Sequence, residues 1–83
     1  MDFISNMKRL YKLHKRIEKG RTGGRAQLAK EMRVNPVTLS KKFYELEELG
    51  AIVKFDKIMN SYYYTNNFKW ELAITFEDET EQS

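Results

Sequence analysis

The spacing of apolar residues changes at Gly50, and this change limits the fold more than any other feature of the sequence. Before Gly50, apolar residues recur every three or four positions, as on one face of an α-helix. After Gly50 they alternate with polar residues, as in a half-buried β-strand. A chain of 83 residues has room for one domain. We therefore predict an α+β domain in which helices precede strands.

Three helices are expected before Gly50, at Asp2–Lys19, Arg25–Met32 and Pro36–Leu49. The first helix carries a stripe of residues at helical spacing that should face the core: Phe3, Ile4, Met7, Leu10, Tyr11, His14 and Ile17. The segment between the first two helices, Arg21–Gly24, contains two adjacent glycines, which predicts a tight connection or one short β-bridge.

The third helix has clear signals at both ends. Asn35 is a favoured N-cap residue, and Pro36 suits the first helical position because its missing N–H costs nothing there. Gly50 is expected to end the helix, because glycine readily adopts the positive φ found there. Leu39, Phe43 and Leu46 form the predicted inner stripe.

Three strands are expected after Gly50. Ala51–Asp56 and Ser61–Thr65 form a predicted hairpin. A third strand places five large apolar side chains on one face: Phe68, Trp70, Leu72, Ile74 and Phe76. This face either covers the first helix or joins two copies, and we expect a homodimer, since an open strand edge invites pairing. Residues 1–77 then form the domain, and residues 78–83 a disordered acidic tail.

Charge is distributed unevenly along the chain. The segment from Lys8 to Lys42 carries 12 Lys and Arg residues against two acids, Glu18 and Glu31. The segment from Glu71 to Ser83 carries five acids and no Lys or Arg. A concentration of positive charge favours a polyanionic partner over the alternative of a solvated basic face.

The order of three helices and a hairpin, with a short turn between the second and third helices, is that of a winged helix-turn-helix. The segment Gln27–Gly50 resembles the DNA-binding domain of DeoR-like and WYL-type regulators. It is closer still to small stand-alone helix-turn-helix proteins common in Bacteroidetes. The matching residues are Leu28, Ala29, Val34, Thr38, Leu39, Leu46, Leu49, Gly50 and the run Tyr62–Tyr64.

This resemblance implies a sequence-specific double-stranded DNA-binding protein, acting as a transcriptional regulator, with helix 36–49 in the major groove. Two departures stand out. Arg33 occupies the turn position where the family usually has glycine. The segment Asn35–Val37 replaces a Ser-Arg-Arg sequence that often supplies basic contacts in the family.

Candidate DNA contacts divide into two groups. Base contacts are expected from the outward side of the third helix, at Val37, Thr38, Ser40, Lys41 and Tyr44. Phosphate contacts, which position a protein without reading sequence, are expected from Arg25, Arg33, Lys42, Lys54 and Lys57. The wing tip Lys57–Asn60 is expected to touch the minor groove or the DNA backbone. The alternative for its apolar residues, Ile58 and Met59, is packing on the body of the protein or on a partner.

Other functional classes find little support. The chain has no cysteine and one histidine, His14, so we expect no metal site and no cofactor. No catalytic constellation or small-molecule site stands out, and we expect no enzyme activity. No apolar run is long enough to span a membrane, so a cytoplasmic, nucleoid-associated protein is expected. The two alternatives to DNA binding are a protein–protein interaction module and an RNA-binding winged helix.

Overall fold

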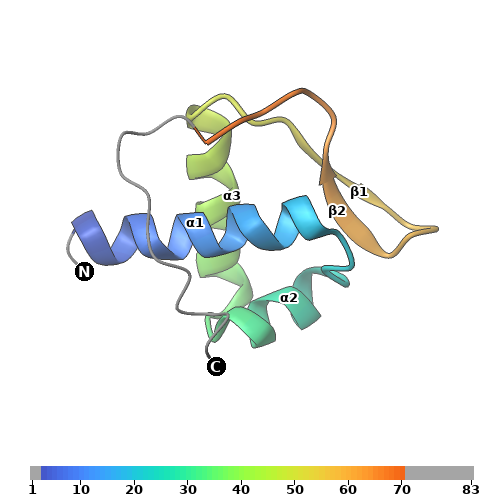
Figure 1. Cartoon of the computed structure of the whole chain (residues 1–83). Helices are drawn as coiled ribbons and strands as arrows, with labels where there is room; N and C mark the ends of the chain where they lie inside the picture. The colour runs from blue at the N-terminus through green and yellow to red at the C-terminus, as the bar shows by residue number, and fades with distance from the viewer. Residues whose placement is uncertain (1–2, 71–83) are drawn as a thin grey trace.

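Three helices and a β-hairpin make up the part of the chain that the structure, a computed structural model, describes: residues 3–70 (Figure 1). The elements are α1 (Phe3–Lys19), α2 (Arg25–Met32), α3 (Pro36–Glu48), β1 (Val53–Asp56) and β2 (Ser61–Tyr64). This order is consistent with a winged-helix-like topology, as the sequence predicts.

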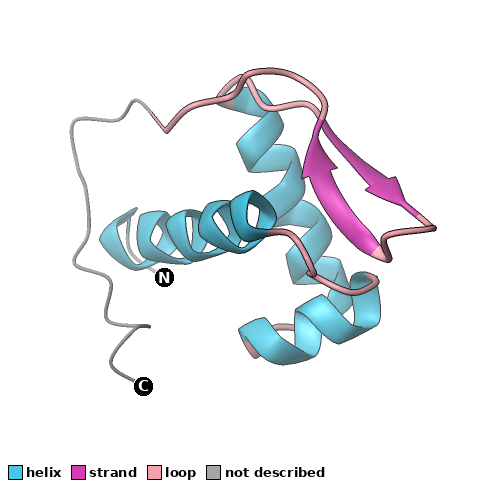
Figure 2. Cartoon of the chain, turned by 45° about the vertical axis from the view of Figure 1, so that its right-hand side comes forward, coloured by secondary structure: helices cyan, strands magenta, loops and turns pink. Residues whose placement is uncertain are grey.

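The helices pack around one small core. Helix α1 crosses the middle of α3, and α2 packs against the N-terminal end of α3 (Figures 1 and 2). The hairpin stands to one side of the helices, with β2 against α1. The buried hydrophobic residues come from all three helices and from the residue after Gly50: Met7, Leu10, Leu13, Ile17, Leu28, Ala29, Leu39, Leu46 and Ala51.

Both predicted ends of α3 are confirmed. The Asn35 side chain caps the helix, because its Oδ1 accepts a hydrogen bond from the Thr38 N–H at 2.8 Å. At the other end Gly50 has a φ of +111°. The Gly50 N–H donates to the Glu47 carbonyl at 3.0 Å, and the Ala51 N–H donates to the Leu46 carbonyl at 3.1 Å. This pair of bonds is a Schellman motif, which satisfies carbonyls at the helix end.

The predicted inner stripe of α1 is right for its central part. Met7, Leu10, His14 and Ile17 are buried, together with the fully buried Leu13, which the predicted stripe omits. Phe3 and Ile4 were expected in the stripe but are exposed.

The hairpin pairs β1 with β2 in an antiparallel register from Val53 opposite Tyr64 to Asp56 opposite Ser61. Both strands are slightly shorter than predicted. The Asn66 side chain closes the open end: its Oδ1 accepts from the Ile52 N–H at 3.0 Å, and its Nδ2 donates to the Gly50 carbonyl at 2.8 Å.

The predicted third strand is not found in the described part of the chain. Phe68 and Trp70 lie in irregular structure after the Asn66 link and are partly buried against the core. Their rings pack on His14 of α1, with centroid distances of 5.5 and 5.6 Å. At Phe68 and Trp70, aromatic packing on a helix therefore takes the place of strand pairing. The other residues of that strand, Leu72, Ile74 and Phe76, lie outside the described residues, as do Asp2 and the predicted tail 78–83.

None of the helices within residues 3–70 has the length and apolar character needed to cross a membrane.

Candidate nucleic-acid interface

The turn between α2 and α3 places Arg33 in the left-handed conformation, with φ of +60° and ψ of +40°. The Arg33 N–H donates to the Lys30 carbonyl at 3.1 Å, and the Val34 N–H donates to the Ala29 carbonyl at 3.0 Å. These bonds form a second Schellman motif. The turn thus has the geometry that glycine favours, although its residue is arginine, and the exposed side chain projects from the turn.

The side of α3 that faces away from the core carries most of the predicted base contacts. Val37, Lys41 and Tyr44 are exposed and follow one another at intervals of four and three residues, so they share one side of the helix. Thr38 and Ser40 are half-buried beside them. We refer to Val37, Lys41 and Tyr44 as the reading surface.

Charge along α3 distinguishes its two halves. The N-terminal half exposes Lys41, whereas Glu47 and Glu48 are exposed near the C-terminal end. Acidic side chains repel phosphates, so only the N-terminal half of this helix is suited to approach a polyanion.

Arg25, at the start of α2, marks the point where α2, α3 and the hairpin meet. Its side chain is exposed, and Nη2 donates to the Pro36 carbonyl at 3.3 Å. Its charge also acts on Tyr62 of β2: burial raises the pKa of the Tyr62 hydroxyl, and nearby Arg25 opposes this rise. Arg25 therefore lies beside the beginning of the reading surface.

Lys42 does not belong with the exposed cations, although the sequence placed it among the phosphate contacts. Lys42 as a whole is only 7% exposed. Its Nζ donates to Asn6 Oδ1 on α1 and, at 3.2 Å, to Glu45 Oε1. The position follows from helical spacing, because residue 42 comes three after Leu39 and four before Leu46, both fully buried. This spacing was the available signal that Lys42 faces inward.

The hairpin contributes two exposed lysines. Lys54 lies on β1 opposite Tyr63, and Lys57 lies in the loop between the strands. With Arg25 and Arg33, they leave four exposed candidates for phosphate contacts.

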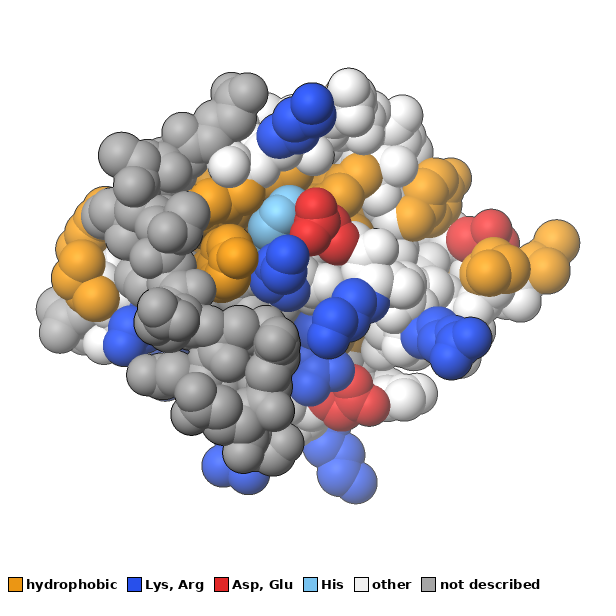
Figure 3. Space-filling model, in the orientation of Figure 1, with side chains coloured by type: hydrophobic (Ala, Val, Ile, Leu, Met, Phe, Trp, Pro, Cys, Tyr) orange, Lys and Arg blue, Asp and Glu red, His pale blue; other side chains and the backbone are white. Residues whose placement is uncertain are grey.

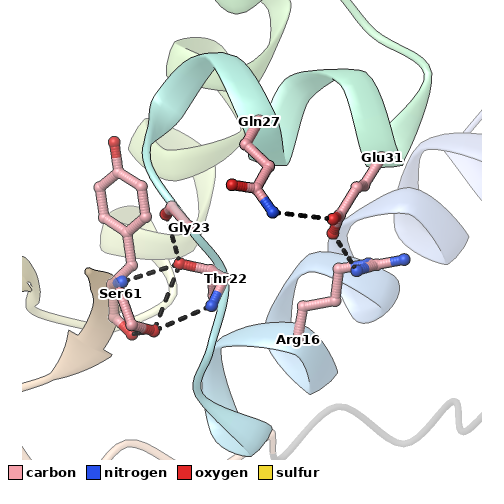
Figure 4. Close-up of polar contacts among 7 residues, drawn as sticks. Arg16, Thr22, Gly23, Gln27, Glu31 and Ser61 are labelled. Atoms are coloured by element: carbon pink, nitrogen blue, oxygen red, sulfur yellow. Dashed lines mark hydrogen bonds and ion pairs between the residues drawn. The ribbon is translucent and has the colours of Figure 1, made fainter. Parts of the chain in front are cut away.

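A buried network that the sequence did not predict fixes the hairpin to the segment before α2 (Figure 4). Thr22 is only 1% exposed. Its N–H donates to Ser61 Oγ at 3.0 Å, and its Oγ1 accepts from the Tyr62 N–H at 2.8 Å. Thr22 Oγ1 also donates to the Gly23 carbonyl at 2.8 Å. The connection expected at Arg21–Gly24 thus contacts β2 through a side chain, without forming a strand.

His14 is a buried core residue. Its Nδ1 lies 2.8 Å from the Tyr64 hydroxyl, and its Nε2 lies 3.5 Å from Glu18 Oε2. Burial lowers the pKa of His14, while Glu18 acts in the opposite direction. Within residues 3–70, no three His, Cys, Asp or Glu side chains are grouped so that they could hold a metal ion.

Comparisons with protein-family models, with curated proteins and with solved structures find no match. The geometry itself brings together the reading surface on α3, Arg25 beside its start, Arg33 in the preceding turn, and the lysines of the hairpin.

Proposed function

We propose that this chain binds double-stranded DNA in a sequence-specific manner, as a transcriptional regulator, with the N-terminal half of α3 in the major groove. The observation that carries the proposal is the exposed reading surface of α3 within a winged-helix-like topology. An α-helix fits the major groove of B-DNA, where each base pair presents a distinct pattern of donors and acceptors.

The roles of the exposed side chains follow from their chemistry. Lys41 is long enough to donate to guanine O6 or N7, and Val37 is suited to contact a thymine methyl group. Tyr44 offers both a ring and a hydroxyl. Arg25, Arg33, Lys54 and Lys57 surround this surface, and we assign them to phosphates, which fix the register of the protein on the duplex.

A protein–protein interaction module is the second candidate, and the exposure of Val37 and Tyr44 favours it. Apolar and aromatic side chains on a helix surface also suit a protein partner. The two functions differ in how binding affinity depends on salt. Affinity for DNA falls steeply as salt concentration rises, because DNA binding releases counterions from phosphates. An RNA-binding role would instead favour structured or single-stranded RNA over duplex DNA.

Selection of bound sequences from a random duplex pool, at two salt concentrations, tests the proposal. Enrichment of a common sequence at both concentrations is the expected result. If no duplex is retained at the lower concentration, the chain does not bind DNA in this way.

Lys41 and Lys42 provide a matched pair of variants for the selected duplex. We expect Lys41→Ala to weaken binding by about 1–3 kcal/mol, the range for a bidentate base contact, without changing thermal stability. Lys42→Met should lower thermal stability, because it removes the links to Asn6 and Glu45, and leave the affinity of the folded protein unchanged. Equal losses of affinity in the two variants would contradict this assignment.

A further inference from the structure

The loop at the end of the hairpin holds the two most exposed of the large hydrophobic side chains in the described residues. Ile58 is 95% exposed and Met59 is 70% exposed. Figure 3 shows hydrophobic side chains at this outer end of the molecule, away from the helices. These side chains contribute almost nothing to the core, so they are available to a binding partner.

The loop is held in a defined shape. Asp56 Oδ1 accepts hydrogen bonds from the Ile58 N–H at 2.9 Å and from the Met59 N–H at 3.3 Å. Asn60 completes the turn with a φ of +54°. Because the backbone is already ordered, the loop has little further backbone entropy to lose on binding.

The hairpin is also anchored beside α3. The ring of Tyr62 lies 4.6 Å from that of Phe43 on α3 and 4.9 Å from that of Phe55 on β1, measured between centroids. The Thr22–Ser61 hydrogen bonds hold the other side of β2. The loop therefore projects from a base fixed relative to the reading surface.

We propose that Ile58 inserts between adjacent base pairs in the minor groove, next to the site read by α3, and kinks the duplex. This inference rests on the proposed DNA-binding function. Isoleucine and methionine are among the apolar side chains that proteins use as wedges between base steps. Lys57 and Lys54 lie along the same hairpin, where their charges match the phosphates on either side of a groove.

The small size of the tip argues against a second copy of the chain as its partner. A stable protein–protein interface buries at least about 1,200 Å² in total. Two side chains on a four-residue loop supply only a small part of that area. A base step, by contrast, is filled by a single side chain.

The experiment uses the selected duplex labelled with a donor and an acceptor dye at its two ends. Fluorescence anisotropy reports binding, and energy transfer in the same titration reports bending. We expect the protein to bend the duplex by about 20–90°. Ile58→Ser should bind with an affinity within about tenfold of the parent, because lost burial and avoided unstacking offset each other, but leave the duplex straight.

Two further variants separate insertion from other causes. Ile58→Leu should restore the bend because it restores an apolar wedge. Ile52→Ser changes another exposed isoleucine, located before β1, and should bend DNA like the parent.

Three outcomes would overturn the proposal while leaving DNA binding intact. The first is a duplex that is bound but stays straight. The second is an Ile58→Ser variant that bends DNA as the parent does. The third is a free protein that forms oligomers or binds anionic vesicles, when Ile58→Ser prevents that association. The tip would then serve a second copy of the chain or a lipid surface. If no duplex is bound at all, the proposed function itself fails.

Discussion

At the scale of single residues, neighbours in the sequence have opposite roles in this protein. Lys41 is exposed on the reading surface, and Lys42 is buried against Asn6 and Glu45. One residue along a helix turns the side chain by about 100°. Total charge therefore describes the candidate binding surface less well than the position of each cation relative to the apolar stripe.

Arg33 is strained by its left-handed backbone. We expect Arg33→Gly to raise the free energy of unfolding by up to about 1 kcal/mol, because glycine removes the Cβ clash of the left-handed backbone. The gain is limited because glycine also increases the entropy of the unfolded chain. Chemical denaturation measures this change. If Arg33 contacts a phosphate, the same variant should bind DNA more weakly.

Arg21 is a control for both effects, because it has a φ of +62° and is also exposed. Arg21→Gly should raise the free energy of unfolding by a similar amount and leave the affinity for DNA unchanged. Equal weakening of DNA binding by the two variants would remove Arg33 from the phosphate contacts.

His14 should make stability depend on pH. Its burial lowers the pKa in the folded protein below the ordinary value of 6.5, so the folded state resists protonation. The stabilisation from neutral His14 is complete above the unfolded pKa and is lost as the pH falls below about 6.5 toward the folded value. Thermal midpoints measured from pH 7.5 to 5 should decrease, and His14→Gln should flatten this decrease. A decrease of the same size in His14→Gln would assign it to other groups.

At the scale of elements, individual side chains such as Thr22 link the hairpin to the helical part of the chain. We expect Thr22→Val to destabilise the protein by about 1–3 kcal/mol, because the Tyr62 N–H loses its acceptor in a part-buried position. Urea denaturation measures the loss. Thr38→Val, at a half-exposed position on α3, should change stability by a smaller amount, and equal effects would contradict the role given to Thr22.

The helices were more predictable than the contacts that link them to the hairpin. Asn35, Pro36 and Gly50 define α3 through local backbone chemistry, which sequence alone contains. The Thr22–Ser61 contact joins residues 39 apart, and nothing in the pattern of either segment indicates the other. The packing of residues 68–70 was unpredictable for a related reason. Alternation shows that Phe68 and Trp70 share one side of an extended chain, but it does not show that His14 of α1, rather than a strand, packs against them.

The candidate site was predictable in outline. The periodicity of α3 separated Val37, Lys41 and Tyr44 from the core, and the structure places all three on the exposed side. The periodicity also contained the spacing that places the Lys42 side chain on the buried side of α3. The periodicity did not indicate how α1 packs on α3, and this packing brings Asn6 to Lys42.

At the scale of the whole molecule, the four exposed phosphate candidates predict how binding responds to salt. Each neutralised phosphate contributes about −0.9 to the slope of log affinity against log salt concentration, so we expect a slope of about −3 to −4. Titrations of the selected duplex over a range of salt concentrations measure it. Removing Lys54 or Lys57 should make the slope shallower by about one. A slope near zero would remove these four side chains from the phosphate contacts.

The long-range link between Thr22 and Ser61 has a consequence for the order of assembly during synthesis. Helices form from local contacts, whereas contacts between distant residues are slow to form because a long loop must close first. The hairpin attaches beside α2 and α3 only after Ser61 and Tyr62 have left the ribosome. A nascent chain that already contains α3 therefore lacks the anchored hairpin until Ser61 and Tyr62 are free to contact Thr22.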